Sequence, residues 1–248
     1  MLLENKNAIV YGAAGAIGGA VARAFARDGA RVFLAGRTLA TLEDVAADIR
    51  AHGGVAEAAQ VDAMDKAAVD AHADRVVAAA GRVDVSFNAV GIPAVQGVAL
   101  TDISVEDFLA PITGLCLTNF LTATAAARHM AAQGAGVIVT LTASSAKESR
   151  HQMGGFNLAN AAIEALTRSL AGEYGRRGVR VVGMRSNFTP ETYPGASDEM
   201  LAVLVKDTLL GRLPRLAEHA ATAVYLASDG AGAMSGAIVN LTCGAIID

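Results

Sequence analysis

Short β-branched runs alternate along the chain with longer alanine-rich stretches in which apolar residues recur every three or four positions. The first pattern is typical of buried strands and the second of helices that pack on one face. Strands are predicted at 7–11, 31–35, 55–61, 83–88, 137–142, 179–184 and 237–241. Helices are predicted at 17–28, 38–52, 65–80, 104–133, 156–174 and 217–228, with a smaller helix near 198–210.

Repeated strand–helix units of this kind predict an α/β fold. We expect a single Rossmann-fold domain over residues 1–248, with a seven-stranded parallel, doubly wound sheet and helices on both faces. A crevice should open at the carboxyl edge of the sheet where the strand order reverses. Left-handed helix exits are expected at the glycines beside the helix ends, namely Gly29, Gly53, Gly81, Gly134 and Gly175.

Composition narrows the class of protein. A length of 248 residues suits one domain, and 20 basic against 24 acidic residues are mixed along the chain without a basic stripe for nucleic acid. The apolar stretch at 108–127 is long enough for a bilayer, but Pro111, Gly114 and Asn119 interrupt it, which indicates a buried helix rather than a membrane span. No membrane or nucleic-acid partner is therefore expected.

The cysteines and the first residues bear on location. Cys116 and Cys243 match no metal or disulfide spacing, and the chain begins without a basic leader followed by a long apolar run. We therefore expect a cytoplasmic protein with no metal site, in which both cysteines are buried as small apolar side chains.

A glycine-rich turn follows the first predicted strand and leads directly into a helix. It reads Gly12-Ala13-Ala14-Gly15-Ala16-Ile17-Gly18. Small residues allow a pyrophosphate to approach the backbone, and the amide groups at the helix N-terminus bind it. The context predicts a dinucleotide site.

The end of the second strand decides which dinucleotide is expected. An acidic side chain there would bind the ribose diol of NAD(H) and repel a 2′-phosphate. Here Gly36 removes the carboxylate, and Arg37, followed by Thr38, offers a guanidinium to a phosphate. NADP(H) is therefore favoured over NAD(H).

The motifs of the whole chain resemble those of the short-chain dehydrogenase/reductase family. Asp62 follows the third strand, 88–91 is similar to the family's Asn-Asn-Ala-Gly segment with Phe87 and Val90 as local departures, and 161–170 looks like its active-site helix. The C-terminal segments 211–213 and 227–229 also match. The glycine turn, the end of strand two and this resemblance together imply a cofactor site formed by Gly12, Ala14, Gly15, Ile17, Gly18, Arg37, Thr38, Asp62, Ala63, Asn88, Ala89 and Gly91.

The resembled family performs its chemistry with a serine, a tyrosine, a lysine four residues after the tyrosine, and an asparagine on the preceding helix. In this chain the lysine position holds Asn160 and the tyrosine position holds Phe156. The serine position holds Ala143 and the asparagine position holds Leu115. We therefore expect a divergent member without the family's proton relay.

One further departure from the family pattern and one neighbouring serine bear on this expectation. Ser186 and Asn187 stand where the family usually has Pro-Gly after the sixth strand. Ser144 lies one residue past the serine position and would point to the opposite face of a regular strand unless a bulge re-aimed it. The nearest tyrosine lies eighteen residues beyond Phe156, so no small shift restores the phenol.

A positioned proton donor contributes about 10²- to 10⁴-fold in rate, so any redox chemistry needs a substitute. The candidates are His151 in the loop that would line the substrate pocket, Tyr193 in a segment that would close over it, and Ser144. The other histidines, His52, His72, His129 and His219, are expected to face solvent.

Three functions stay open on the sequence. The first is an NADP(H)-dependent oxidoreductase with a non-standard active site. The second is a non-redox lyase, isomerase or cyclase, and the third is a catalytically silent NADP-binding subunit. In each case the expected partners are a small-molecule substrate and, through the helices at 104–133 and 156–174, a homotetramer or homodimer.

Overall fold

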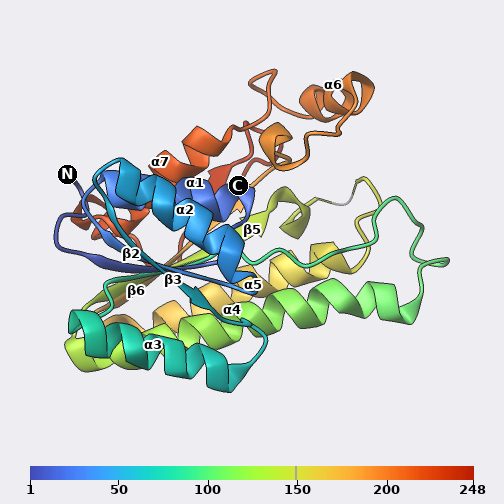
Figure 1. Ribbon diagram of the computed structural model, residues 1–248. Helices are drawn as coiled ribbons and strands as arrows, with labels where there is room; N and C mark the ends of the chain where they lie inside the picture. Colours follow the sequence, from blue (N-terminus) through green and yellow to red (C-terminus); the bar gives the residue numbers. More distant parts are fainter. Residues whose placement is uncertain (149) are drawn as a thin grey trace.

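The structure is a computed structural model that describes residues 1–148 and 150–248. Within these residues, seven parallel strands form one sheet in the order β3-β2-β1-β4-β5-β6-β7 (Figure 1). They are β1 (Asn7–Tyr11), β2 (Arg31–Gly36), β3 (Val55–Gln60), β4 (Val85–Asn88), β5 (Gly136–Ala143), β6 (Val179–Ser186) and β7 (Ile238–Leu241). The predicted fold class is confirmed, and the strand order reverses between β1 and β4.

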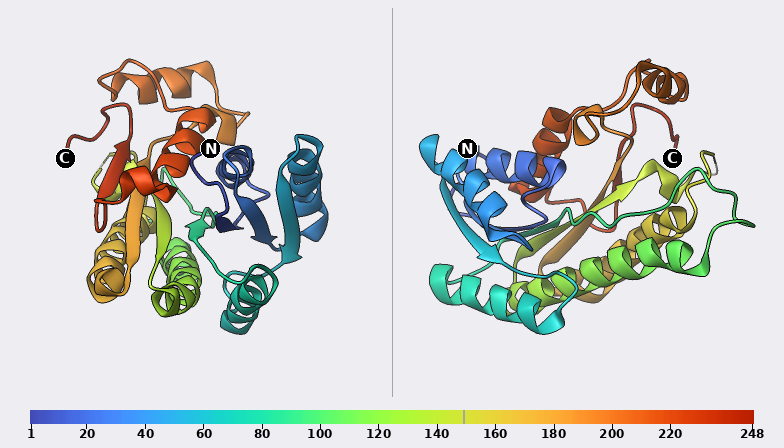
Figure 2. Two further views of the ribbon diagram at one scale, coloured as in Figure 1. Left: turned by 90° about the vertical axis from the view of Figure 1, so that its left-hand side faces the viewer. Right: turned by 45° about the vertical axis from the view of Figure 1, so that its right-hand side comes forward.

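Helices cover both faces of this sheet, as the repeated strand–helix units predict (Figures 1 and 2). One face carries α1 (Ala16–Arg27), α2 (Leu39–Ala51) and α7 (Leu216–Ala227), and the other carries α3 (Lys66–Ala80), α4 (Val105–Gln133) and α5 (Gly155–Tyr174). The short helix α6 (Asp198–Lys206) lies apart from both layers. Short 3-10 turns occur at Ser144–Ala146, Gly175–Arg177, Pro190–Thr192 and Asp229–Ala231.

Alternation along β1 divides the core into two apolar layers. Ala8 and Val10 pack with the α1, α2 and α7 side, whereas Ile9 and Tyr11 pack with the α3 and α4 side. Because every strand of a parallel sheet is covered on both faces, its residues are apolar in succession rather than alternately. This is the pattern from which the strands were predicted.

The helix α4 is the apolar stretch that resembled a membrane span. Within the described residues it alone is long and apolar enough to cross a bilayer by length and composition, and half of its most apolar 18-residue window is buried in the fold. Ser104 caps its start by accepting a hydrogen bond from the Asp107 amide, and Gly134 ends it in the left-handed conformation. The helix packs against α5 and the sheet, as expected.

The exit from α5 differs from the prediction. Gly175 has φ −56° and continues into a 3-10 turn, so the predicted left-handed exit there is wrong. Gly178 adopts φ +79° instead, and a Cβ at this position would lie 1.9 Å from the Gly134 carbonyl oxygen. The glycine is therefore required where the chain turns into β6 against the end of α4.

Two of the histidines and both cysteines also depart from expectation. His72 and His219 are 2% and 0% exposed, because each lies on the inner face of its helix, so the solvent-facing prediction is wrong for both. Cys116 and Cys243 are only partly buried. His72 packs edge-to-face on Tyr11, and its Nδ1 has no hydrogen-bond partner among the described residues.

Burial makes His72 an acid-sensitive point of the fold. Removal from water lowers the pKa of its imidazole from 6.5 to about 4. The unfolded chain therefore takes up a proton near pH 6.5, whereas the folded protein resists protonation until about pH 4, and the free energy of unfolding falls as the pH drops through this window. The complete loss amounts to about 3 kcal/mol.

Between about pH 7 and about pH 4.5, we expect the free energy of unfolding of the unsubstituted protein to fall by roughly 2 kcal/mol more than that of His72→Leu. Urea unfolding at the two pH values measures the difference. His52→Leu is the matched control, because the His52 side chain is 80% exposed. An unchanged pH dependence in His72→Leu would contradict the assignment.

Candidate functional site

The carboxyl ends of β1, β4, β5 and β6 meet at one edge of the sheet and open into a cavity of about 1140 Å³. Its walls are completed by the turn into α1, the segment after β4, the start of α5 and one face of α6. This is the edge at which the strand order reverses, where open α/β sheets bind their ligands. The predicted crevice is therefore present.

The turn after β1 fits a phosphate group. Gly12 has φ +72°, and a Cβ there would lie 2.6 Å from the Ala89 carbonyl oxygen. A Cβ on Gly18 would lie 2.3 Å from the Gly12 carbonyl oxygen. The helix α1 starts at Ala16 without a side-chain cap or an acidic residue in its first turn, so its N-terminal amides stay available to an anion beside the cavity.

The residues expected at the adenosine end follow β2 and β3. Arg37 and Thr38 are exposed, and no carboxylate of the described residues forms an ion pair with the Arg37 guanidinium. Gln60 donates a hydrogen bond to the Arg37 carbonyl oxygen at 2.9 Å, which fixes the backbone there. Asp62 is exposed, with one carboxylate oxygen 2.9 Å from the Met64 amide, and Ala63 is buried beside it.

The segment after β4 forms the floor of the cavity between the two ends of the site. Asn88 is buried, and its amide donates to the Thr122 hydroxyl at 2.8 Å while its oxygen accepts from the Val90 amide. Ala89 and Gly91 line the cavity, together with Gly15 and Ile17 of the first turn. Ala14 and Gly18 belong to the same turn but lie outside the cavity lining.

The four positions at which the resembled family is polar come together at the far wall of the cavity, and Leu115, Ala143, Phe156 and Asn160 all line it. The Asn160 amide is held by the backbone, because its oxygen accepts from the Ala143 amide at 2.9 Å and its nitrogen donates to the Phe156 carbonyl at 2.8 Å. Leu115 packs with Ala159, Ile163 and the Phe156 ring. The wall that results is apolar.

The three candidate proton donors all line the same cavity. Ser144 begins the 3-10 turn after β5, and its hydroxyl lies 3.3 Å from the Asn187 side-chain oxygen. Tyr193 is 55% exposed and stacks edge-to-face on Phe188. His151, with φ +68°, lies in the loop between β5 and α5.

His151 belongs to a cluster of charges that ties this loop to α6. Its Nε2 lies 2.9 Å from Asp207 Oδ2 and 3.3 Å from Glu148 Oε1. These three side chains are close enough together to hold a metal ion. However, the Arg150 guanidinium pairs with both carboxylates, at 3.1 Å to Glu148 and 2.7 Å to Asp207, and already balances half of their charge. We assign no metal here.

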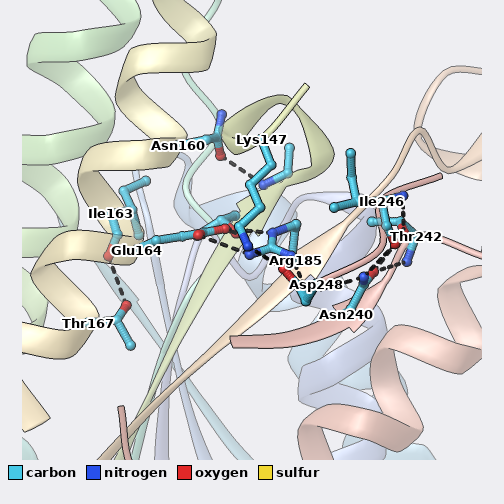
Figure 3. A network of polar contacts seen from close by, with 12 residues as sticks. Lys147, Asn160, Ile163, Glu164, Thr167, Arg185, Asn240, Thr242, Ile246 and Asp248 are labelled. Carbon is cyan, nitrogen blue, oxygen red and sulfur yellow. Dashed lines mark hydrogen bonds and ion pairs between the residues drawn. The ribbon is translucent and has the colours of Figure 1, made fainter. Parts of the chain in front are cut away.

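A second network of charges connects α5 and β6 with Asp248, one helical turn along α5 from Asn160 (Figure 3). Arg185 of β6 is 1% exposed and donates to both carboxylate oxygens of Glu164 on α5, at 2.7 and 3.0 Å. Its remaining nitrogen donates to Asp248 at 2.6 and 2.7 Å, and Lys147 donates to the same carboxylate. Arg185 and Lys147 lower the pKa of Asp248 to about 2. The charges are thus paired.

Sequence reasoning missed one polar pair at the cavity. Ser186, the last residue of β6, lines the cavity, and its hydroxyl oxygen lies 2.5 Å from Nε2 of His219 on α7. Nδ1 of the same ring lies 2.8 Å from the Arg215 carbonyl oxygen. Ser186 stood out as a departure from the family pattern, but thirty-three positions separate it from His219. No spacing along the chain connects the two.

Comparisons with known proteins agree with this geometry. A family profile described as enoyl-(acyl carrier protein) reductase matches residues 12–245. The uncharacterized oxidoreductase YxbG of Bacillus subtilis (strain 168) is 32% identical over 244 residues, which cover 94% of this chain and 88% of the relative. The chain belongs to the short-chain dehydrogenase/reductase family. D-threitol dehydrogenase of Mycolicibacterium smegmatis is 30% identical over 240 residues, which cover 95% of this chain and 90% of the relative.

Solved structures share the fold from end to end. A short-chain type dehydrogenase/reductase from Mycobacterium marinum superimposes with a TM-score of 0.89 at 29% identity, covering 99% of this chain and 97% of the other. Short-chain dehydrogenases/reductases are oxidoreductases that bind nicotinamide cofactors. The free amides of α1 and the close approach at Gly12 fit the phosphates of such a cofactor, and the cavity beyond them has room for its nicotinamide end and a substrate.

The buried ion network supports a prediction about stability. Replacing Arg185 by Met leaves Glu164 buried without its partner, so we expect a loss of about 3 to 5 kcal/mol in the free energy of unfolding, measured with urea. Lys147→Ala is the control. Its side chain is 47% exposed, and an exposed ion pair contributes at most about 1 kcal/mol. Equal losses in the free energy of unfolding for the two variants would contradict the prediction that burial of Glu164 makes the loss of Arg185 more destabilising.

Proposed function

We propose that this short-chain dehydrogenase/reductase transfers hydride between NADP(H) and a neutral, largely apolar alcohol or carbonyl compound, by a proton route that does not use the family's serine, tyrosine and lysine. The observation that carries the proposal is a single cavity that joins an intact phosphate-binding turn to an apolar wall. When bound, the cofactor supplies or accepts the hydride, and the protein supplies binding, orientation and proton transfer.

The preference for NADP(H) rests on Arg37. Its guanidinium is exposed at the end of β2, is not paired with any carboxylate of the described residues, and follows a glycine that carries no competing acidic side chain. A guanidinium forms charge-assisted hydrogen bonds with a phosphate, whereas the 2′-hydroxyl of NAD(H) gives it no charged partner.

The departure from the family's proton relay rests on the far wall. Phe156 has no hydroxyl, Ala143 has no side-chain polar group, and both amide groups of Asn160 are engaged with the backbone. Ser144, His151 and Tyr193 stay candidates for proton transfer because they line the cavity. Of these, His151 is held by two carboxylates, which ties its ring to α6 rather than to the far wall.

The substrate class rests on the character of the lining. Ile92, Met153 and Phe188 face the cavity together with Met200 and Val203 of α6. None of the described lining residues is Lys or Arg, so a carboxylate or phosphate substrate finds no cation. The acidic side chains that do line it are paired with Arg150. Such a cavity gains most from binding a neutral apolar ligand.

The non-redox enzyme and the silent NADP-binding subunit are not favoured, because the relatives that match over the full chain are described as an oxidoreductase and a dehydrogenase. We also propose that the protein forms a homodimer or homotetramer in the cytoplasm. Val105, Leu109 and Phe120 of α4 and Leu158 of α5 are 46% to 74% exposed, an apolar surface that a second copy would cover.

Arg37→Ala should weaken NADPH binding by about 10- to 100-fold and leave NADH binding nearly unchanged, since a hydrogen bond to a charged group contributes about 1.5 to 3 kcal/mol. Calorimetric titration with each cofactor measures both constants. Arg27→Ala is the control, because Arg27 is exposed at the opposite end of α1. No binding of either cofactor by the unsubstituted protein would contradict the proposed function.

The lining predicts the choice of substrate. Cyclohexanol should be oxidised with a kcat/KM at least about 100-fold above that of cyclohexane-1,2,3,4,5,6-hexol. The apolar wall offers no hydrogen bonds to replace those that the five additional hydroxyls make with water. Initial rates of NADP⁺ reduction give the ratio. Val203→Asp should reduce it, whereas Val55→Asp, at an exposed position outside both the cavity and the proposed oligomer surface, should not. A preference for the hexol would contradict the substrate class.

A further inference from the structure

We propose that Ser186 and His219 form a proton-transfer pair that opens into the cavity, in which Ser186 is a catalytic residue and His219 acts through it as the base. The proposal rests on the proposed redox function and names the proton route that the function requires. With a neutral His219 as the base, the pair favours oxidation of an alcohol by NADP⁺ at neutral pH.

The register of the sheet brings Ser186 to the reacting end of the cavity. Strands β5 and β6 run on to Ala143 and Ser186, which are paired across the two strands. Ala143 is the position at which the family carries its serine. Neighbouring strands lie about 4.8 Å apart and paired residues point to the same face, so the hydroxyl of Ser186 is displaced by one strand from the family's hydroxyl.

The hydrogen bonds of His219 fix which nitrogen is the base. Its Nδ1 faces the Arg215 carbonyl oxygen at 2.8 Å, and a carbonyl can only accept, so the proton of the neutral ring is on Nδ1. Nε2 then presents a lone pair to the Ser186 hydroxyl at 2.5 Å. The single hydroxyl proton of Ser186 cannot serve two acceptors at once, so the Asn187 carbonyl oxygen at 2.8 Å is its alternative acceptor. The pair has the orientation in which serine donates and histidine accepts.

The surroundings of His219 keep its ring neutral. The side chain is 0% exposed, and burial lowers its pKa, although the Arg215 carbonyl acts in the opposite direction. Two carboxylates act on the ring in the same direction as that carbonyl, Glu218 of α7 and Glu191 of the 3-10 turn, and each raises its pKa without outweighing burial. Arg212 neutralises Glu218 with hydrogen bonds at 2.7 and 2.9 Å. On β6 the charge of Arg185 is directed to the other face, toward Glu164.

Proton and hydride balance in this arrangement. As the alcohol is oxidised, its C–H bond breaks and the hydride leaves to NADP⁺, its O–H proton passes to Ser186 Oγ, and the proton of Ser186 passes to His219 Nε2. The C=O bond forms and Ser186 ends as it began. After the carbonyl product leaves, the imidazolium returns one proton through Ser186 to water in the cavity. Carbonyl reduction is the reverse and needs His219 protonated first, so it is favoured at lower pH.

The first test needs neither cofactor nor substrate. The protein is treated with diisopropyl fluorophosphate, in which Ser186 Oγ bonds to phosphorus, fluoride leaves and the serine proton passes to His219; peptide mass spectrometry locates the adduct. We expect Ser186 to be labelled, and labelling of His219→Gln to be at least about 100-fold slower. His129→Gln, at the far end of α4, is the matched control. Absence of label on Ser186, or equal rates in His219→Gln, would overturn the pair.

The second test separates the pair from the proposed function. Ser186→Ala should reduce kcat for NADP⁺-dependent cyclohexanol oxidation by at least about 100-fold, with NADPH affinity by calorimetry unchanged, and Ser186→Thr should retain most of the rate. His219→Gln should abolish the rise of kcat with pH, which a structural role would not do. Full activity in Ser186→Ala would overturn the pair and leave the function standing. NADPH binding without oxidation of any alcohol would overturn both.

Discussion

The turn after β1 touches the turn after β4 backbone to backbone, and the position of every other part of the cavity depends on this contact. Any side chain at Gly12 would overlap the Ala89 carbonyl, and the Ala89 amide donates to the Tyr11 carbonyl at 3.0 Å. Because β1 and β4 are neighbours at the reversal of strand order, the contact brings the N-terminus of α1 to the cavity edge. The phosphate site therefore follows from packing of the main chain and requires no cationic side chain.

The acidic side chains around the cavity are bound to arginines, either beside its apolar wall or at its rim. Glu164 lies one helical turn beyond Asn160 and is bound to Arg185, so its carboxylate faces away from the cavity. At the rim, the carboxylates of Glu148 and Asp207 are bound to Arg150. An unpaired charge in either place would carry a large desolvation penalty. At the wall, Leu115, Ala143 and Phe156 need no partner and the Asn160 amide has its partners in the backbone, which supports the proposed neutral apolar substrate.

Local patterns were enough to predict the strands, the glycine turn after the first strand and the edge of the sheet at which the cavity opens. Periodicity and glycine spacing are properties of short segments, and they gave α4 and the turn at Gly12 correctly. They could not show that β5 and β6 extend to Ala143 and Ser186, because each extension is stabilised by the other strand. For the same reason the burial of His219 was missed, since what buries it is the packing of α7 on the sheet.

The two unusual features of β6 support each other. Arg185 and Ser186 are consecutive, so their side chains leave the strand on opposite faces. Arg185 is held by Glu164 on α5 and by Asp248, while Ser186 meets His219 on α7. A strand end held by hydrogen bonds on both faces has little freedom to shift, and a proton relay needs that rigidity because proton transfer requires hydrogen-bond contact. The ion network thus contributes to the site through the backbone, without any charge entering the cavity.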